Sequence, residues 1–144
     1  MIYCSGALFY ATKTSRFLLL HRTQGKNSQC WGLVGGSLEG TETAWEGLLR
    51  ETAEEIGFVP DILKTFPLEK YVNSKETFEY NTYLCIIKEE FIPQLNKEHN
   101  GYTWCSYNNW PKPLHRGLQS TFNNKVNRAK IDTVLEVAHY LDKI

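Results

Sequence analysis

The sequence predicts one α/β domain in which helices cover a β-sheet, and two observations carry this prediction. Strand-like segments lie at the start and in the middle of the chain, while helical segments lie between and after them. The chain has 144 residues, of which 42% are hydrophobic, and this is enough to build one core. Because no repeat, low-complexity segment or linker interrupts the chain, we expect a single domain over residues 1–144.

The first part of the chain predicts two strands separated by a turn. Ile2–Tyr10 is rich in β-branched and aromatic residues and predicts a strand. Thr12–Ser15 predicts a turn, and Phe17–Leu20 continues as a buried strand that ends at a histidine and Arg22. Thr23–Gln29 is polar and predicts a loop.

A glycine-rich stretch follows, and after it the pattern predicts a helix from about Thr43 to Ile56. Thr43 and Glu46 form a capping box at its start, whereas Gly57 and Pro60 end it. At roughly 100° per residue, one stripe of this helix should face the core. That stripe consists of Trp45, Leu48, Leu49, Thr52 and Ile56.

The second half of the chain predicts shorter strands and then helices. Tyr71–Val72 and Thr77–Ile87 have the composition of strands and are joined by a polar turn, and Tyr102–Ser106 predicts another short strand. Two prolines then break the chain, a helical segment starts after His115, and Ile131–Ile144 predicts an amphipathic helix. This order of elements favours an α/β or α+β sandwich.

Charge and cysteine content exclude several classes of protein. Sixteen basic residues balance sixteen acidic ones, so the net charge predicts neither a membrane partner nor an extended nucleic-acid surface. The chain has no run of about eighteen apolar residues, and its N-terminus lacks the basic region of a signal peptide. The four cysteines form no CxxC pair, which argues against a zinc site and a disulfide framework and indicates a cytoplasmic protein.

Three glutamates crowd one face of the predicted helix, namely Glu51, Glu54 and Glu55. Like charges at this spacing cost roughly 0.2–0.5 kcal/mol per pair, and the helix dipole disfavours anions in the last turn. Ala44 and Gly47 share this face and leave room for a ligand to approach. The face is therefore either a solvated acidic surface or a site for a hard divalent cation, which usually brings substrate phosphates with it.

The glycine-rich segment WGLVGGSLEGTE decides between these two interpretations. From Gly36 the chain runs through five residues to Glu42, through seven more to Arg50, and on through ETAEEIGF. This pattern closely resembles the Nudix box: Gly, five residues, Glu, seven residues, Arg-Glu, a hydrophobic residue, any residue, Glu-Glu, any residue, Gly and a hydrophobic residue. Every charged and glycine position of the box is filled over its 23 residues, so the sequence is identified as a member of the Nudix hydrolase family.

The resemblance extends beyond the box. FLLLHR is similar to a family strand that ends in a basic residue, CWGLVGG to the usual entry into the Gly-Gly pair, and KEHNGYTW to a later segment in which many small Nudix enzymes carry an acid. WPKPLHRGL resembles phage-type and related hydrolases of ADP-containing compounds. Two positions depart from the pattern. Val34 stands where proline is common, which leaves the loop less rigidly preset, and Thr52 occupies a hydrophobic position, where its methyl group can pack.

The resemblance implies a fold, a reaction and roles for particular residues. The fold would be the Nudix α/β/α sandwich with a mixed sheet. The reaction would hydrolyse a nucleoside diphosphate linked to another group X, with Mg²⁺ or Mn²⁺ as the cofactor. Glu42 and Arg50 would orient the acids of the box. The metal ligands would be Glu51, Glu54, Glu55 and a backbone carbonyl near Gly35 or Gly36.

Residues outside the acidic helix are expected to complete the site. Arg22 would contact a phosphate, next to the substrate contacts implied for Gly35, Gly36 and Glu42. Glu98, in the segment NKEHNG, is either a solvated loop acid or a further catalytic residue that acts as a metal ligand or as the general base. The four histidines show no ligand spacing, and no stacking pair can be chosen among the nineteen aromatic residues.

The leading hypothesis is a pyrophosphohydrolase that releases a nucleoside monophosphate and phosphorylated X from ADP-ribose, FAD, dinucleoside polyphosphates or nucleotide sugars. Cleavage of nucleoside triphosphates and decapping of RNA 5′ ends are the alternatives. A prenyl-diphosphate isomerase and a non-catalytic nucleotide sensor are remoter, and the retention of every box acid argues against the sensor. The expected partner is a small nucleotide, and a homodimer is one assembly that the sequence allows.

Overall fold

The computed structural model describes residues 1–25, 28–141 and 143. In chain order its strands are β1 (Ile2–Ala11), β2 (Arg16–Arg22), β3 (Trp31–Gly32), β4 (Val34–Ser37), β5 (Lys64–Val72), β6 (Phe78–Ile87) and β7 (His99–Cys105). Its helices are α1 (Ala44–Ile56), α2 (Arg116–Asn123) and α3 (Lys125–Leu141). Across these residues no helix has the length and apolar character needed to cross a membrane.

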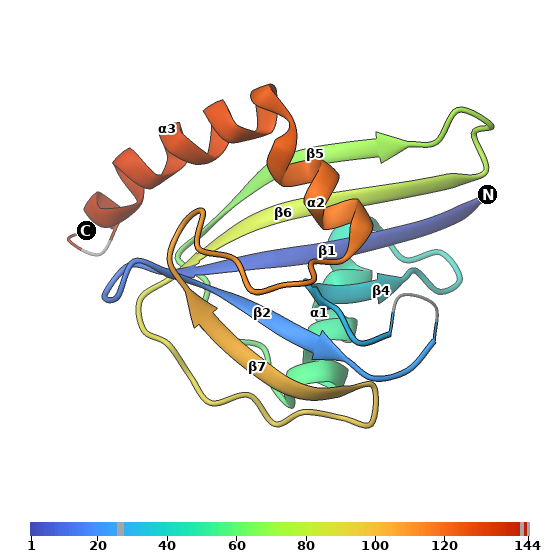
Figure 1. Cartoon of the computed structure of the whole chain (residues 1–144), viewed down its shortest axis with the longest axis horizontal. Helices are drawn as coiled ribbons and strands as arrows, with labels where there is room; N and C mark the ends of the chain where they lie inside the picture. The colour runs from blue at the N-terminus through green and yellow to red at the C-terminus, as the bar shows by residue number, and fades with distance from the viewer. Residues whose placement is uncertain (26–27, 142, 144) are drawn as a thin grey trace.

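Strand β1 lies at the centre of a mixed sheet with the strand order β3-β2-β1-β6-β5. It pairs in parallel with β6 along its whole length. On its other edge β1 pairs antiparallel with two strands in turn, with β4 along Cys4–Ala7 and with β2 along Tyr10–Ala11. Strand β7 extends the sheet beyond β2. The sheet is therefore divided on this side into a β4 branch and a β2–β3–β7 branch (Figure 1).

Helices cover both faces of the sheet, α2 and α3 on one face and α1 on the other (Figure 1). Successive side chains of a strand point to opposite faces, so the apolar strands supply two cores. The face under α2 and α3 buries Leu8, Tyr10, Phe17, Leu19, Leu84 and Ile86. The face under α1 buries Ala7, Phe9, Leu18, Leu20, Cys85 and Ile87. The predicted α/β/α sandwich with a mixed sheet is confirmed.

Helix α1 begins and ends where the sequence predicts. The Thr43 hydroxyl accepts a hydrogen bond from the Glu46 amide at 3.1 Å, and the Glu46 carboxylate accepts one from the Thr43 amide at 2.9 Å. Gly57 ends the helix in the left-handed conformation, with φ 88°. Thr52 is buried, and its hydroxyl donates to the Leu48 carbonyl at 2.7 Å, so a polar residue is accommodated at a hydrophobic position of the box.

The space predicted beside Gly47 is filled by another side chain. The side chain of Leu38 packs against Gly47, where a Cβ atom would collide with the Leu38 Cδ2 atom. Leu38 is an apolar residue in a polar loop, and the notch at Gly47 is where that side chain is accommodated. A ligand therefore does not approach α1 over this glycine.

Strand β5 is longer than the predicted Tyr71–Val72, because it begins at Lys64. Pro67 hides the strand pattern in the sequence, but it is tolerated here because β5 pairs with β6 on one side only. Strands β3 and β4 were also missed, since they lie within the glycine-rich stretch that predicts a loop.

Helix α3 begins at Lys125, before the predicted start at Ile131. Its first turns bury Asn127 and so give no apolar pattern. The Asn127 amide donates to the Glu69 carboxylate of β5 at 2.8 Å, which holds the helix on the sheet. The predicted last residue of this helix, Ile144, lies outside the described residues.

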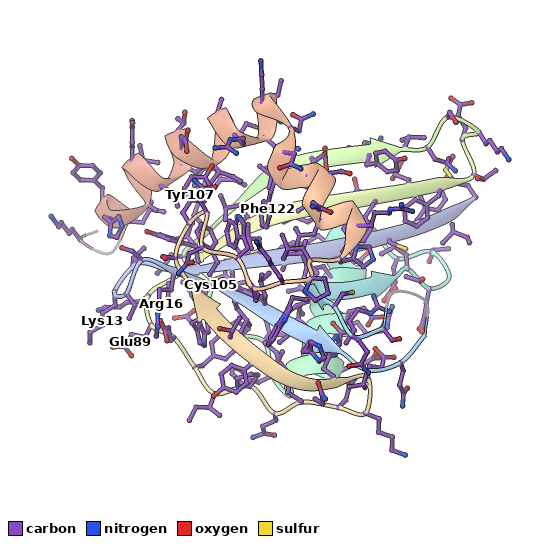
Figure 2. All side chains as sticks on the ribbon, viewed as in Figure 1. Lys13, Arg16, Glu89, Cys105, Tyr107 and Phe122 are labelled. Carbon is purple, nitrogen blue, oxygen red and sulfur yellow. The ribbon has the colours of Figure 1, made fainter. Side chains whose placement is uncertain are left out.

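The turn between β1 and β2 is tied to the chain after β6 by charged pairs. Lys13 Nζ lies 2.9 Å from Glu89 Oε1, and Arg16 donates two hydrogen bonds to Glu90 at 2.6 and 2.7 Å. Figure 2 shows Lys13, Arg16 and Glu89 together at this end of the sheet. Exposed ion pairs of this kind contribute little to stability.

Candidate active site

The acids of α1 lie between the two branches of the sheet, because the helix packs against β4. Glu55 is buried, with only 3% of its surface exposed. Its Oε1 atom accepts a hydrogen bond from the Gly35 amide of β4 at 2.7 Å, and its Oε2 atom faces His99 of β7 at 3.9 Å. Glu51, one turn earlier, lies against Gly36. The helix therefore brings two of its three acids to the Gly-Gly pair.

A side chain at either glycine of this pair would disturb the site. At Gly35, where φ is +155°, a Cβ atom would collide with the carbonyl oxygen of Ser5 in β1. At Gly36 a Cβ atom would lie 2.7 Å from the Glu51 Cδ atom, closer than two such carbons can approach. The glycines thus allow the β4 backbone to touch β1 on one side and the Glu51 carboxylate on the other.

Arg50 hydrogen-bonds three acids through one guanidinium group. It binds Glu42 with two hydrogen bonds, from Nε to Oε2 at 2.8 Å and from Nη2 to Oε1 at 3.0 Å. Its Nη1 atom donates to Glu51 at 3.1 Å and to Glu54 at 3.2 Å. Its Nη2 atom also donates to the Ser37 carbonyl at 2.9 Å. The planar fork of arginine suits such paired contacts, so Arg50 fixes these acids relative to the end of β4.

Burial and neighbouring charges set different pKa values along the helix. Hydrogen bonds from Arg50 lower the pKa of Glu42. Burial raises the pKa of Glu51, and Arg50 opposes this shift. Burial raises the pKa of Glu55 to about 9, the Gly35 amide opposes the rise, and the charges of Glu51 and Glu98 add to it. Without a cation, Glu55 is therefore protonated at neutral pH.

The loop into β7 brings Glu98 and His99 to Glu55. One ligand atom from each of these three residues lies within 4.8 Å of the other two. The Thr23 amide donates to the Glu98 carbonyl at 2.9 Å, which fastens the loop to the end of β2. His99 is 6% exposed, and burial lowers its pKa to about 4 with a further contribution from the charge of Arg22. Its imidazole is therefore neutral at neutral pH.

Arg22 ends β2 next to this group. The pairing of β2 with β7 shifts register between His21 and Arg22, and Arg22 then lies opposite His99. Burial lowers the pKa of His115, and the charge of Arg22 adds to this shift. No hydrogen bond or ion pair joins its guanidinium group to another residue that the structure describes. Arg22 therefore offers a positive charge beside the acids.

The structure brings most of the predicted site residues together, in two sets. Glu42, Glu51 and Glu54 surround Arg50, whereas Gly35, Glu55 and Glu98 form the second set. Glu54 is the outermost acid, with 54% of its side chain exposed. Gly35 contacts Glu55 through its amide, and the carbonyl ligand that the resemblance implies stays a prediction.

His99 is the site residue that sequence reasoning missed, because the histidines show no ligand spacing along the chain. Its position next to Glu98 was the one available signal. The group formed by Glu55, Glu98 and His99 has the chemistry of a site for a divalent cation. Two carboxylates and one neutral imidazole are common metal ligands, and both carboxylates lack a positive partner among the described residues. The donor set fits the cation that the Nudix resemblance implies.

Comparisons with solved structures give the same fold. The chain is similar to RenU, a Nudix hydrolase from M. smegmatis, with 21% identity, a TM-score of 0.72 and coverage of 91% of this chain and 84% of that chain. It is similar to a MutT Nudix hydrolase from Burkholderia pseudomallei, with 19% identity, a TM-score of 0.66 and coverage of 86% and 97%. The NUDIX domain of Shewanella oneidensis NrtR, in a complex with ADP ribose, matches with 17% identity, a TM-score of 0.63 and coverage of 91% and 88%.

Sequence comparisons identify the family. The comparison with curated proteins gave no match. The protein-family model of the NUDIX domain matches residues 4–124, which include the whole of the box and the loop that carries Glu98 and His99. Because this match spans most of the 144 residues, the chain belongs to the NUDIX domain family, the family of the Nudix hydrolases.

Proposed function

We propose that the protein is a metal-dependent pyrophosphohydrolase that cleaves the diphosphate of a nucleoside diphosphate linked to X. The observation that carries this proposal is the buried Glu55 carboxyl group, held by the Gly35 amide and facing Glu98 and His99 without a positive partner among the described residues. A buried carboxylate is costly unless a cation neutralises it, so Glu55 would keep its proton until a cation binds. Mg²⁺ or Mn²⁺ is the proposed cofactor.

The residues of α1 and the preceding Glu42 would have two separate roles, metal binding and orientation of the metal ligands. Glu51, Glu54 and Glu55 would supply carboxylate oxygens, and Arg50 and Glu42 would keep Glu51 and Glu54 oriented. A bound divalent cation would neutralise phosphate oxygens and make water more acidic. Arg22, whose guanidinium group has no hydrogen-bond or ion-pair partner among the described residues, would bind a substrate phosphate and position the diphosphate over the acids.

Glu98 is the proposed general base. It is exposed, unlike Glu55, and its loop is fastened to β2 through Thr23. From this place its carboxylate would accept a proton from the water that attacks phosphorus. The bond from phosphorus to the bridging oxygen would then break, which gives a nucleoside monophosphate and phosphorylated X. No serine or cysteine nucleophile is needed for this reaction.

An ADP-containing compound is the proposed substrate class, with ADP-ribose and FAD as the first candidates. The segment WPKPLHRGL supports this through its resemblance to hydrolases of such compounds, and so does the similarity to the NrtR domain that was crystallised with ADP ribose. A small nucleotide is thus the proposed partner. The buried free thiols of Cys4, Cys85 and Cys105 support a cytoplasmic location.

A substrate screen tests the proposal. ADP-ribose, FAD, a dinucleoside polyphosphate, a nucleotide sugar, nucleoside triphosphates and capped RNA are incubated with Mg²⁺ or Mn²⁺, and the products are separated by chromatography. We expect AMP and a second phosphate ester from an ADP-linked compound, and no turnover in excess chelator. Faster release of pyrophosphate from triphosphates would replace the proposed substrate class. Full activity in chelator would overturn the metal-dependent mechanism.

A further inference from the structure

The imidazole of His99 is buried at the site and has an unused nitrogen atom. His99 is 6% exposed, and its Nδ1 atom is buried without a hydrogen-bond partner among the residues that the structure describes. Buried polar atoms in folded proteins nearly always have a partner, because their lost hydration must be replaced. An unpartnered nitrogen that faces carboxylates therefore indicates that a ligand belongs between them.

The surroundings of this nitrogen define the kind of ligand. Glu55 Oε2 lies 3.9 Å from this nitrogen, which is too long for a hydrogen bond. Two ligands on one cation, with bonds of about 2.1 Å, lie about 3.0 Å apart when adjacent and about 4.2 Å apart when opposite. The separation of 3.9 Å falls within this range, and Glu98 supplies a third donor within 4.8 Å of both. The gap therefore has the size of a metal ion.

The state of the ring suits metal binding. A neutral imidazole has one ring nitrogen with a free lone pair, and Nδ1 is the ring nitrogen that lacks a hydrogen-bond partner among the described residues. The Glu55 carboxyl group is held through its other oxygen by the Gly35 amide, which leaves Oε2 directed at His99. The group is thus positioned by main-chain contacts on the Glu55 side and by strand β7 on the His99 side.

We propose that His99 Nδ1 binds the metal ion together with Glu55 and one oxygen of Glu98, whose other oxygen can act as the base, and that the centre prefers a first-row transition metal such as Mn²⁺ or Co²⁺ to Mg²⁺. Imidazole suits transition metals, whereas Mg²⁺ takes oxygen ligands and keeps its waters. This inference rests on the proposed function for the location of the metal site. It adds a nitrogen ligand and a metal preference that the carboxylates of α1 do not specify.

The first experiment detects the nitrogen ligand directly. Metal-free protein is loaded with Mn²⁺, and pulsed electron paramagnetic resonance is used to observe coupling of the metal to ¹⁴N. We expect the coupling in the wild-type protein and its loss in His99→Asn, which keeps a polar side chain of similar reach. His139→Asn is the matched control, because His139 lies on α3 and hydrogen-bonds Tyr10. Coupling that is absent from the wild-type protein, or unchanged in His99→Asn, would overturn the proposal.

The second experiment measures metal preference by calorimetry. His99→Asn should weaken Mn²⁺ and Co²⁺ binding at least about tenfold, the scale seen for changes that merely support a metal ligand. Mg²⁺ binding should change by less than about threefold, because the asparagine oxygen can replace a water. Equal losses for all three ions would contradict the metal preference.

A measurement on the wild-type protein covers the case in which His99→Asn does not fold. Zn²⁺ is added to ¹⁵N-labelled protein, and the nitrogen resonances of the histidine rings are followed. We expect a shift of the His99 Nδ1 resonance and none for His139, and an unmoved His99 resonance would contradict the proposal. Hydrolysis with Mg²⁺ in a protein without nitrogen coupling would leave the proposed function standing and reject this inference. Nitrogen coupling without any hydrolysis would support the His99 ligand and reject the proposed function.

Discussion

Two groups of carboxylates lie beside helix α1, and they differ in how their charge is balanced. Around Arg50, the acids Glu42, Glu51 and Glu54 accept hydrogen bonds from one guanidinium group. On the buried side, Glu55 faces Glu98 and a neutral His99. In the first group Arg50 supplies a positive partner for the acids without any ligand, whereas the second group has no positive partner among the described residues.

This difference assigns separate jobs to acids that look equivalent in the sequence. The Arg50 group fixes the end of β4 and the start of the acidic face without any ligand. In the Glu55 group, ionising the buried Glu55 carboxyl group near Glu98 is unfavourable, and a bound cation would remove this cost. Changes in the Arg50 group should therefore affect both stability and activity, while changes in the Glu55 group should affect activity and improve the stability of the metal-free protein.

Changing Glu55 to Gln is expected to have the largest effect. The amide oxygen can still accept the Gly35 hydrogen bond, but the side chain no longer carries a charge for the cation. The kcat value should fall by orders of magnitude while the fold is kept, as judged by circular dichroism. Glu136→Gln on α3 is the control. Wild-type turnover in Glu55→Gln would contradict the role of the buried acid.

The same variant tests how the stability of the metal-free protein depends on pH. Burial raises the pKa of Glu55 from 4.5 to about 9. Below pH 4.5 the carboxyl group is protonated in both the folded and the unfolded chain, so its ionisation does not change the free energy of unfolding. As the pH rises toward about 9 the unfolded chain loses this proton and the folded chain keeps it, so metal-free stability falls.

Thermal unfolding measures this effect. The Tm of Glu55→Gln without metal should exceed that of the wild-type protein increasingly between pH 5 and pH 9, by about 2–4 °C for each kcal/mol gained. Added Mn²⁺ should reverse the order, because the cation stabilises only the wild-type site. A constant difference in Tm across this pH range would contradict the raised pKa.

Changing Glu98 to Gln should be next in size. Loss of a general base typically lowers kcat by about 10²–10⁴-fold. The loss should be greatest at low pH and partly recovered at high pH, where hydroxide replaces the base, and the fold should be unchanged because the side chain is exposed. The measurement is kcat from pH 6 to 9. A wild-type profile would return the role of the base to an acid on α1.

How much of this could be predicted depends on the range of the interactions. The caps of α1 follow from residues three and four apart, and the resemblance to the box gave Glu42 and Arg50 the role of orienting the acids. The contact between Glu55 and His99 depends instead on the register of β2 with β7, which sets Arg22 opposite His99. That register involves a shift in pairing, and no local pattern reports it.

The same reasoning explains the errors in the fold. Strand β5 contains Pro67 and charged residues, because it lies at the edge of the sheet and is exposed to solvent, and its pattern is therefore weak. The pocket expected at Gly47 is filled by Leu38, a contact between a loop and a helix that the helical pattern alone does not specify. Local periodicity predicted the elements, whereas contacts across the fold decided which surfaces remain open.

Changing Arg50 to Lys should have an intermediate effect. It tests the group of acids that Arg50 holds. Lysine keeps the charge but cannot bind Glu42 with two parallel hydrogen bonds while also reaching Glu51 and Glu54. We expect a loss of about 1–3 kcal/mol in the free energy of unfolding, measured with urea, and a fall in kcat of about tenfold. Unchanged stability with lower activity would show that Arg50 serves the reaction and not the scaffold.

Changing Gly36 to Ala should have the smallest effect and tests how closely the two groups are linked. The added Cβ would lie 2.7 Å from the Glu51 Cδ atom, and the end of this flexible side chain can move while the β4 backbone stays in place. Stability should therefore change by less than about 1 kcal/mol, but the Glu51 carboxylate should leave its position between Arg50 and the buried acids. A kcat reduced by about tenfold, together with weaker Mn²⁺ binding, is the expected result. Gly101→Ala is the matched control, since a Cβ there meets its nearest neighbour, His21 Cβ, at an ordinary 3.6 Å. If Gly36→Ala kept wild-type metal binding and kcat, then Glu51 would belong to the Arg50 scaffold alone, and the cation would depend on Glu55 and its partners from the β7 loop.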